Sequence, residues 1–155
     1  MIRKVAVIGL GNIAKRHRKN LKTRFPDATL FAISASGRIP IEPVEDADYL
    51  LAGIDELLKA KPDFVIVASP ASHHAKYAAT LIKAGIPTLI EKPVTAKLSD
   101  ITELLALIQN NKTANAVGYC LRYLPSTIKL KQLLEEKVIG SIYNCSINVG
   151  QFLPD

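Results

Sequence analysis

The sequence has little of what marks a secreted or membrane protein. Two cysteines, Cys120 and Cys145, are too few for a disulfide framework, so we expect a reducing compartment, the cytoplasm. No apolar run approaches the roughly 20 residues that a helix needs to span a bilayer, so we expect no membrane partner. Residues 5–10 are apolar and follow a basic pair, but this run is too short for a signal peptide.

Aromatic residues are also scarce, at 6% of the chain, and this bears on the interpretation of its positive charge. The formal net charge is +6, and much of the excess comes from residues 15–19 together with Lys22 and Arg24. A basic patch can bind nucleic acid, but a protein that binds single strands interleaves aromatic residues with its charges. None is interleaved here, so we expect no nucleic-acid partner and predict that the run forms the solvated face of a helix.

Hydrophobic residues make up 48% of the chain, enough for a real core, and short apolar runs alternate with helical patterns. We expect strands at residues 5–8, 29–34, 64–68, 88–90, 114–118 and 141–149, and helices at residues 13–24, 54–59, 74–84, 98–109 and 126–137. The first five strands are rich in Val and Ile, which is typical of a parallel sheet covered by helices on both sides. The pattern predicts an α/β fold, a doubly wound parallel sheet of the Rossmann type.

The last expected strand differs because apolar and polar residues alternate strictly along it. Its apolar members are Tyr143, Cys145, Ile147 and Val149. Such alternation leaves one face exposed to solvent, as in an antiparallel sheet. We therefore expect this strand to begin a truncated second domain at residues 141–155, after a Rossmann domain at residues 1–140. With its apolar face uncovered, the segment from Ser141 to Gly150 would pair with a second copy and form a homodimer; the alternative is that it folds back on its own domain or stays disordered.

The first expected strand runs directly into a glycine turn that opens a helix. Gly9 permits the tight turn, Gly11 lets the backbone approach a phosphate, and Ala14 allows helix and strand to pack closely. The N-terminus of the helix then offers free N–H groups and a partial positive charge to a dinucleotide pyrophosphate. This context favours nucleotide binding, and a purely structural glycine turn is the alternative.

The end of the second expected strand suggests which nicotinamide cofactor is bound. An NAD enzyme places an acidic residue on the ribose diol about twenty residues past the glycine turn. This chain has Ser34, Ser36 and Arg38 there instead, and hydroxyls with an arginine suit a 2′-phosphate. We therefore expect NADP rather than NAD, with an ordinary Ser-Gly turn as the alternative.

Two further strand ends carry candidate site residues. Ser69 and Pro70 follow the strand at residues 64–68, at the sheet edge where ligands of such folds bind. The adjacent His73 and His74 point to different faces and make a poor metal pair, so we expect no metal site. His74 is a candidate to face the cofactor, and helix capping or surface exposure is the alternative.

The fourth strand ends in the motif Glu91-Lys92-Pro93. A lysine at the carboxyl edge of the sheet lies where the nicotinamide ring and the substrate would meet, and its ammonium could bind a substrate hydroxyl and take part in proton transfer. Taken alone, a surface charge pair before a proline is the alternative interpretation.

These motifs, in this order along essentially the whole chain, resemble the Gfo/Idh/MocA family of NAD(P)-dependent sugar and polyol oxidoreductases. The glycine turn with His17, Pro70 with His74, the Glu-Lys-Pro motif and residues 118–123 carry the resemblance. It implies that Gly9, Gly11, Asn12 and Ile13 hold the pyrophosphate, that Ser69, Pro70 and His74 line the cofactor groove beside Glu91, and that Lys92 is the catalytic or substrate-orienting lysine.

The chain departs from the family pattern in two ways. Cys120 stands where many members have asparagine, which puts one polar contact near the substrate in doubt. The chain also ends before the family's Asp and His motif, so we expect no turnover from these residues alone. Two functions stay open: the cofactor part of an oxidoreductase that transfers hydride to or from a sugar-type hydroxyl, and a nucleotide-binding module without turnover.

Overall fold

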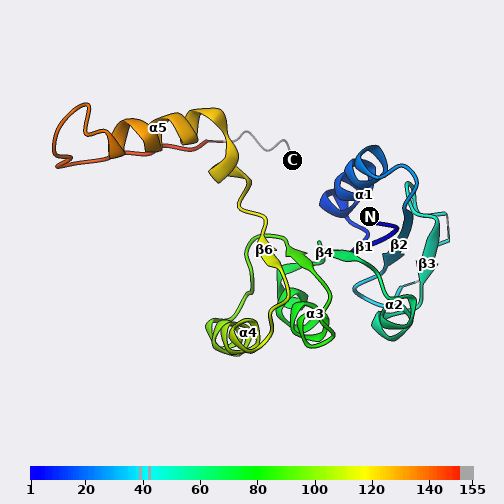
Figure 1. Ribbon diagram of the computed structural model, residues 1–155. Helices are drawn as coiled ribbons and strands as arrows, with labels where there is room; N and C mark the ends of the chain where they lie inside the picture. The colour runs from blue at the N-terminus through cyan, green and yellow to red at the C-terminus, as the bar shows by residue number, and fades with distance from the viewer. Residues whose placement is uncertain (39, 42, 151–155) are drawn as a thin grey trace. The chain divides into compact units, whose positions relative to one another are not determined.

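The computed structural model describes residues 1–38, 40–41 and 43–150, and it divides into two compact units (Figure 1). The first unit is Met1–Tyr119, and the second begins at Cys120. This division falls earlier in the chain than the boundary predicted after residue 140.

The first unit contains a six-stranded, all-parallel sheet with the order β3-β2-β1-β4-β5-β6. The strands are β1 (Lys4–Ile8), β2 (Thr29–Ile33), β3 (Tyr49–Leu51), β4 (Phe64–Val67), β5 (Thr88–Ile90) and β6 (Asn115–Val117). The chain builds outward from β1 to β3 and then returns to continue on the other side of β1 with β4. This reversal between β1 and β4 is the switch point of a doubly wound sheet, so the predicted fold class is confirmed.

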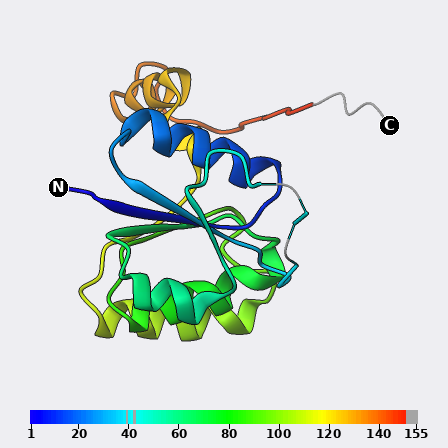
Figure 2. The ribbon, with the colours of Figure 1, turned by 90° about the vertical axis from the view of Figure 1, so that its right-hand side faces the viewer.

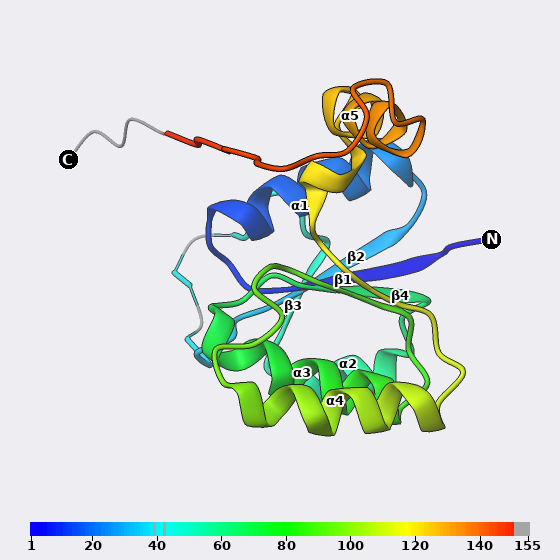
Figure 3. The same cartoon turned by 90° about the vertical axis from the view of Figure 1, so that its left-hand side faces the viewer.

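Helices cover both faces of the sheet. They are α1 (Asn12–Arg24), α2 (Ile54–Ala60), α3 (Ala71–Lys83) and α4 (Leu98–Asn110). Figures 2 and 3 show α1 on one face, with α2, α3 and α4 on the opposite face. This arrangement explains why β1, β2 and β4 are apolar along almost their whole length, since their side chains are buried on both faces.

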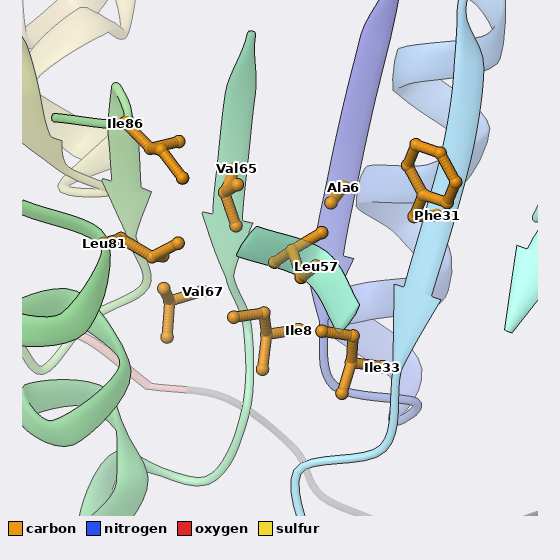
Figure 4. Packing of buried hydrophobic residues seen from close by; sticks show 9 residues of the cluster. All are labelled: Ala6, Ile8, Phe31, Ile33, Leu57, Val65, Val67, Leu81 and Ile86. Atoms are coloured by element: carbon orange, nitrogen blue, oxygen red, sulfur yellow. The ribbon is translucent and has the colours of Figure 1, made fainter. Parts of the chain in front are cut away.

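The largest core cluster lies between the sheet and the helices α2 and α3 (Figure 4). Ile8 pairs in register with Ile33 on one side and with Val67 on the other, and all three side chains are fully buried. Leu57 of α2 and Leu81 of α3 pack onto this row. Each such side chain contributes about 1.5–3 kcal/mol of burial free energy, so the strand ends that carry the site rest on a rigid base.

Two features of the first unit differ from expectation. The strand β3 was not predicted, because only three residues form it and two of them, Tyr49 and Leu50, are exposed. The helix α3 begins at Ala71, directly after Pro70, and not at His74 as expected. Both histidines therefore lie in the first turns of α3, beside the end of β4.

The second unit contains a 3-10 turn, η1 (Cys120–Tyr123), and the helix α5 (Pro125–Glu135), whose first position is a proline, as is common in helices. The strand expected at residues 141–149 is wrong for this structure: those residues form no strand. A strand exists only where its N–H and C=O groups pair with a neighbour, and none of the strands in the described part of the chain pairs with this segment. Its side chains are exposed, with Tyr143 at 96% and Val149 at 88%.

None of the helices in the described part of the chain is both long enough and apolar enough to cross a membrane.

Candidate functional site

The glycine turn between β1 and α1 has the geometry that its residues predict. Gly9 has φ +125°, and its N–H donates to the carbonyl oxygen of Ile33 at 2.8 Å, which joins the ends of β1 and β2. A Cβ on Gly9 would collide with the backbone carbonyl of Ala68 at the end of β4. Glycine is therefore required at this position because three strand ends meet around it.

The start of α1 leaves its backbone donors free for a ligand. Gly11 is the N-cap residue, it is exposed, and no atom lies within 4 Å of where its Cβ would stand. No side chain caps the helix, and its first turn contains no acidic residue. The first N–H groups of α1, near the exposed Asn12 and Ile13, thus point to open space with the positive end of the helix dipole behind them.

A groove of about 360 Å³ lies along the carboxyl ends of β1, β2 and β4. Its lining includes predicted residues from all three strand ends, namely Gly9, Gly11, Ile13, Ser34, Ser36, Ser69 and Pro70, together with Leu10, Ala35, Ala68 and His73. The groove therefore brings together residues that are up to about sixty positions apart in the sequence, as parallel strands do when they end at one edge. Asn12, Arg38, His74, Glu91 and Lys92 lie outside this lining, and the roles assigned to all of these site residues, inside and outside the lining, stay predictions.

His74 is buried and bridges two loops. Its Nε2 lies 2.7 Å from the carbonyl oxygen of Ser69, after β4, and its Nδ1 lies 2.7 Å from the carbonyl oxygen of Pro93, after β5. His73, which sequence reasoning did not place in the site, lines the groove instead and lies beside Tyr77 with ring centroids 6.5 Å apart. The signal was present in the sequence, because adjacent residues on a helix cannot face the same side.

Glu91 lies at the end of β5 and its carboxylate is held by the protein itself. His17 Nε2 lies 2.8 Å from Glu91 Oε1, and the backbone N–H of Lys92 donates to Glu91 Oε2 at 3.1 Å. The side chains of His17 and Glu91 are only 16% and 12% exposed. The Lys92 side chain, in contrast, is exposed at the carboxyl edge of the sheet.

Arg18 corrects the expectation that residues 15–19 form a solvated face. Its side chain is 3% exposed, its Nε donates to the carbonyl oxygen of Glu45 at 2.8 Å, and its Nη1 donates to that of Gly9 at 3.3 Å. Burial lowers the pKa of Arg18, and the nearby Asp46 and Glu45 partly offset this effect. The guanidinium therefore supports the glycine turn from inside the protein.

Helical spacing could have revealed this residue. Ala14, Arg18 and Leu21 are the buried residues of α1, and they follow one another at intervals of four and three positions. Arg18 thus stands in the middle of the inward face, between two apolar residues, although Arg16 and Lys19 nearby in the sequence are basic and exposed.

Comparison with known proteins agrees with this geometry. Residues 3–119 match the family model described as the oxidoreductase family with an NAD-binding Rossmann fold, GFO_IDH_MocA. The chain belongs to this family. The family assignment confirms the resemblance inferred from the glycine turn and the Glu-Lys-Pro motif, and it places an NAD-binding Rossmann fold on the unit that contains the groove.

Individual relatives cover the same region. Inositol 2-dehydrogenase 1 of Saccharopolyspora erythraea is 29% identical over 143 residues, which are 88% of this chain and 42% of the relative. The structure of scyllo-inositol dehydrogenase from Lactobacillus casei with bound NAD(H) and scyllo-inositol is 25% identical with a TM-score of 0.78, covering 90% of this chain and 43% of the other. GenD2 from gentamicin A biosynthesis, in complex with NAD, is 27% identical with a TM-score of 0.73, covering 88% and 40%. This chain thus spans less than half the length of these relatives.

Proposed function

We propose that this chain binds a nicotinamide dinucleotide in the groove at the carboxyl ends of β1, β2 and β4, as the cofactor-binding part of an oxidoreductase that acts on a hydroxyl of a sugar or sugar derivative. The observation that carries the proposal is the convergence of the tight Gly9 turn, the open Gly11 and the uncapped start of α1 on one groove. The sugar-type substrate is supported by the inositol dehydrogenases among the relatives.

The residues present fit the cofactor. The pyrophosphate would accept hydrogen bonds from the first N–H groups of α1, near Gly11, Asn12 and Ile13, where no side chain or acidic residue competes. The adenosine ribose would then lie toward Ser34 and Ser36, whose hydroxyl oxygens are 3.3 Å apart. This places the two halves of the binding site on different strand ends of one rigid sheet.

Within this proposal we favour NADP over NAD. Ser34 and Ser36 offer hydroxyls at the position where a 2′-phosphate would lie, Arg38 follows closely, and among the residues that the structure describes no carboxylate lines the groove. Calorimetric titration with both cofactors tests the binding and the preference together. Tighter binding of NADP supports both, equal or tighter binding of NAD refutes the preference alone, and binding of neither refutes the proposed function.

Lys92 is the proposed catalytic residue. Its exposed ammonium group, at the carboxyl edge of β5, is free to reach the hydroxyl of a substrate seated over the sheet. The nicotinamide, when bound, supplies the hydride acceptor or donor. On oxidation, Lys92 in its neutral amine form would accept the proton of the reacting hydroxyl and become an ammonium group; on reduction, the ammonium form would donate that proton back to the oxygen.

A binding module without turnover is the second candidate function. The observation that favours it is that the groove accounts for cofactor binding, which both candidates share; the chain spans 42% and 43% of the lengths of these two relatives. Turnover with a panel of sugars and polyols separates the two candidates, because both predict cofactor binding and only the first predicts product.

We also propose that the chain forms a homodimer through the segment from Ser141 to Gly150. Its apolar side chains are exposed, including Ile147 at 79%, and each forgoes about 1.5 kcal/mol or more of burial free energy in water. Two copies paired antiparallel about a two-fold axis would satisfy the backbone groups and cover these side chains together.

Cys120 and Cys145 are unpaired and exposed, which supports a reducing compartment such as the cytoplasm.

A further inference from the structure

The carboxylate of Glu91 joins the end of β5 to the helix α1. Its Oε1 lies 2.8 Å from His17 Nε2 on α1, and its Oε2 accepts the backbone N–H of Lys92 at 3.1 Å. His17 and Glu91 are 74 positions apart in the sequence, and both side chains are largely shielded from water. Both oxygens of the carboxylate are therefore engaged by the chain itself.

The end of β6 leaves room for this arrangement. A Cβ on Gly118 would lie 3.3 Å from Glu91 Oε1, a contact tighter than side chains usually make. The N–H of Gly118 donates to the carbonyl oxygen of Ile90 at 2.8 Å, so the backbone of β6 is fixed beside Glu91. Glycine at position 118 thus lets the carboxylate lie against the sheet and still reach α1.

The two partners of Glu91 lie at the two functional ends of the proposed site. His17 is one turn into α1, the helix whose first N–H groups would bind the pyrophosphate. Lys92 is the proposed catalytic residue. A helix moves as a rigid body, so any shift of the start of α1 on cofactor binding moves His17 with it.

We propose that Glu91 is a positioning residue rather than a cofactor-binding one, and that the His17–Glu91 hydrogen bond couples the cofactor-binding start of α1 to the backbone of Lys92. This proposal rests on the proposed function of the groove. The His17 ring donates a hydrogen bond to Glu91, and Glu91 accepts the backbone N–H of Lys92. Together these bonds restrain the backbone of Lys92 and so set the direction of its side chain. If this hydrogen bond only stabilised the fold, cofactor binding at the glycine turn would not change the backbone of Lys92.

Residue-resolved amide hydrogen exchange, measured by NMR on the full chain with and without saturating NADP, tests the coupling. In the wild type, the cofactor should slow exchange at Lys92 and at residues 94–95. In His17→Phe, which keeps a ring but has no donor, the cofactor-induced slowing at Lys92 should fall by about tenfold, whereas slowing at residues 11–13 persists. His17→Gln, which keeps an N–H donor, should restore the response at Lys92.

Asp63→Asn is the matched control. The Asp63 carboxylate also accepts two backbone N–H groups, from Arg3 at 2.7 Å and from Lys4 at 2.9 Å, but at the opposite edge of the sheet. This variant should lose stability without changing the response of Lys92. If His17→Phe behaves like Asp63→Asn, the pair is merely structural and the proposal is overturned.

A second arm needs no cofactor. In the free chain, the Lys92 amide should exchange at least several-fold faster in Glu91→Ala than in the wild type, and unchanged exchange would overturn the positioning role. Binding of neither NADP nor NAD to the wild type would instead refute the proposed function and the coupling with it, while this second arm would still decide whether Glu91 positions Lys92.

Discussion

Replacing each glycine of the β1–α1 turn by alanine should separate folding from binding. Gly9→Ala forces a side chain into φ +125° and drives its Cβ against the Ala68 carbonyl, with Ser69 N at 3.0 Å. Backbone strain of this kind costs about 1–3 kcal/mol and overpacking about 1–3 kcal/mol more, so we expect a loss of about 2–6 kcal/mol. Gly11→Ala meets no atom within 4 Å and has an ordinary φ of −73°, so its stability should change by less than about 0.5 kcal/mol.

Cofactor affinity should depend on position 11, although the stability of the fold does not. The new methyl group at position 11 would stand where the pyrophosphate must approach the backbone, so Gly11→Ala should weaken cofactor binding by tenfold or more despite its normal stability. Urea unfolding gives the stability, and calorimetric titration gives the affinity. Wild-type stability of Gly9→Ala would refute the packing argument, and wild-type affinity of Gly11→Ala would place the pyrophosphate elsewhere.

Four further results are expected. Arg18→Met should cost about 1–3 kcal/mol of unfolding free energy in urea, because the carbonyl oxygens of Gly9 and Glu45 lose their donor in a buried and a part-buried hydrogen bond, whereas Arg16→Met on the exposed face should cost almost nothing. Backbone hydrogen bonds hold the pKa of Asp63 below its usual 3.8, so the stability that this carboxylate adds is present at neutral pH and is lost as the pH falls through the lowered pKa. The difference in unfolding free energy between the wild type and Asp63→Asn should therefore close on acidification, and a difference that stays constant with pH would contradict this. In a longer, active protein that carries this chain, Lys92→Ala should lower turnover roughly a hundredfold with little change in cofactor affinity, and near-normal turnover would disprove the assignment. Sedimentation at micromolar concentration should show a dimer that is lost when residues 141–150 are deleted, so a monomeric wild type or a persistent dimer would exclude that interface.

Local pattern was enough to predict the central strands and the glycine turn. Strands buried on both faces are nearly continuous apolar runs, and β1, β2 and β4 are such runs. The conformational demand at Gly9 is equally local, because only glycine enters a tight turn of that kind without strain. The family model matched over residues 3–119 supports the same interpretation.

The local sequence pattern did not predict strands correctly where strand formation depends on pairing with another segment. Residues 141–149 have strand-like alternation, but no neighbouring strand pairs with them among the described residues, so they form no strand. The reverse holds for β3, whose three residues carry little signal of their own but pair in register with β2. A strand is a property of two segments, and the sequence of one of them cannot establish it.

The sequence by itself determined which residues stand at the carboxyl ends of the strands, because in a parallel sheet every strand delivers the residues after it to the same edge. That is why Gly9, Ser34 and Ser69 could be assigned to one groove before their positions were known. Only the tertiary structure decided that Arg18 donates to the carbonyl oxygens of Glu45 and Gly9 and that His17 meets Glu91, since these contacts depend on how α1 packs across the sheet. Backbone periodicity is local, whereas the partner of a polar side chain is chosen by packing between distant segments.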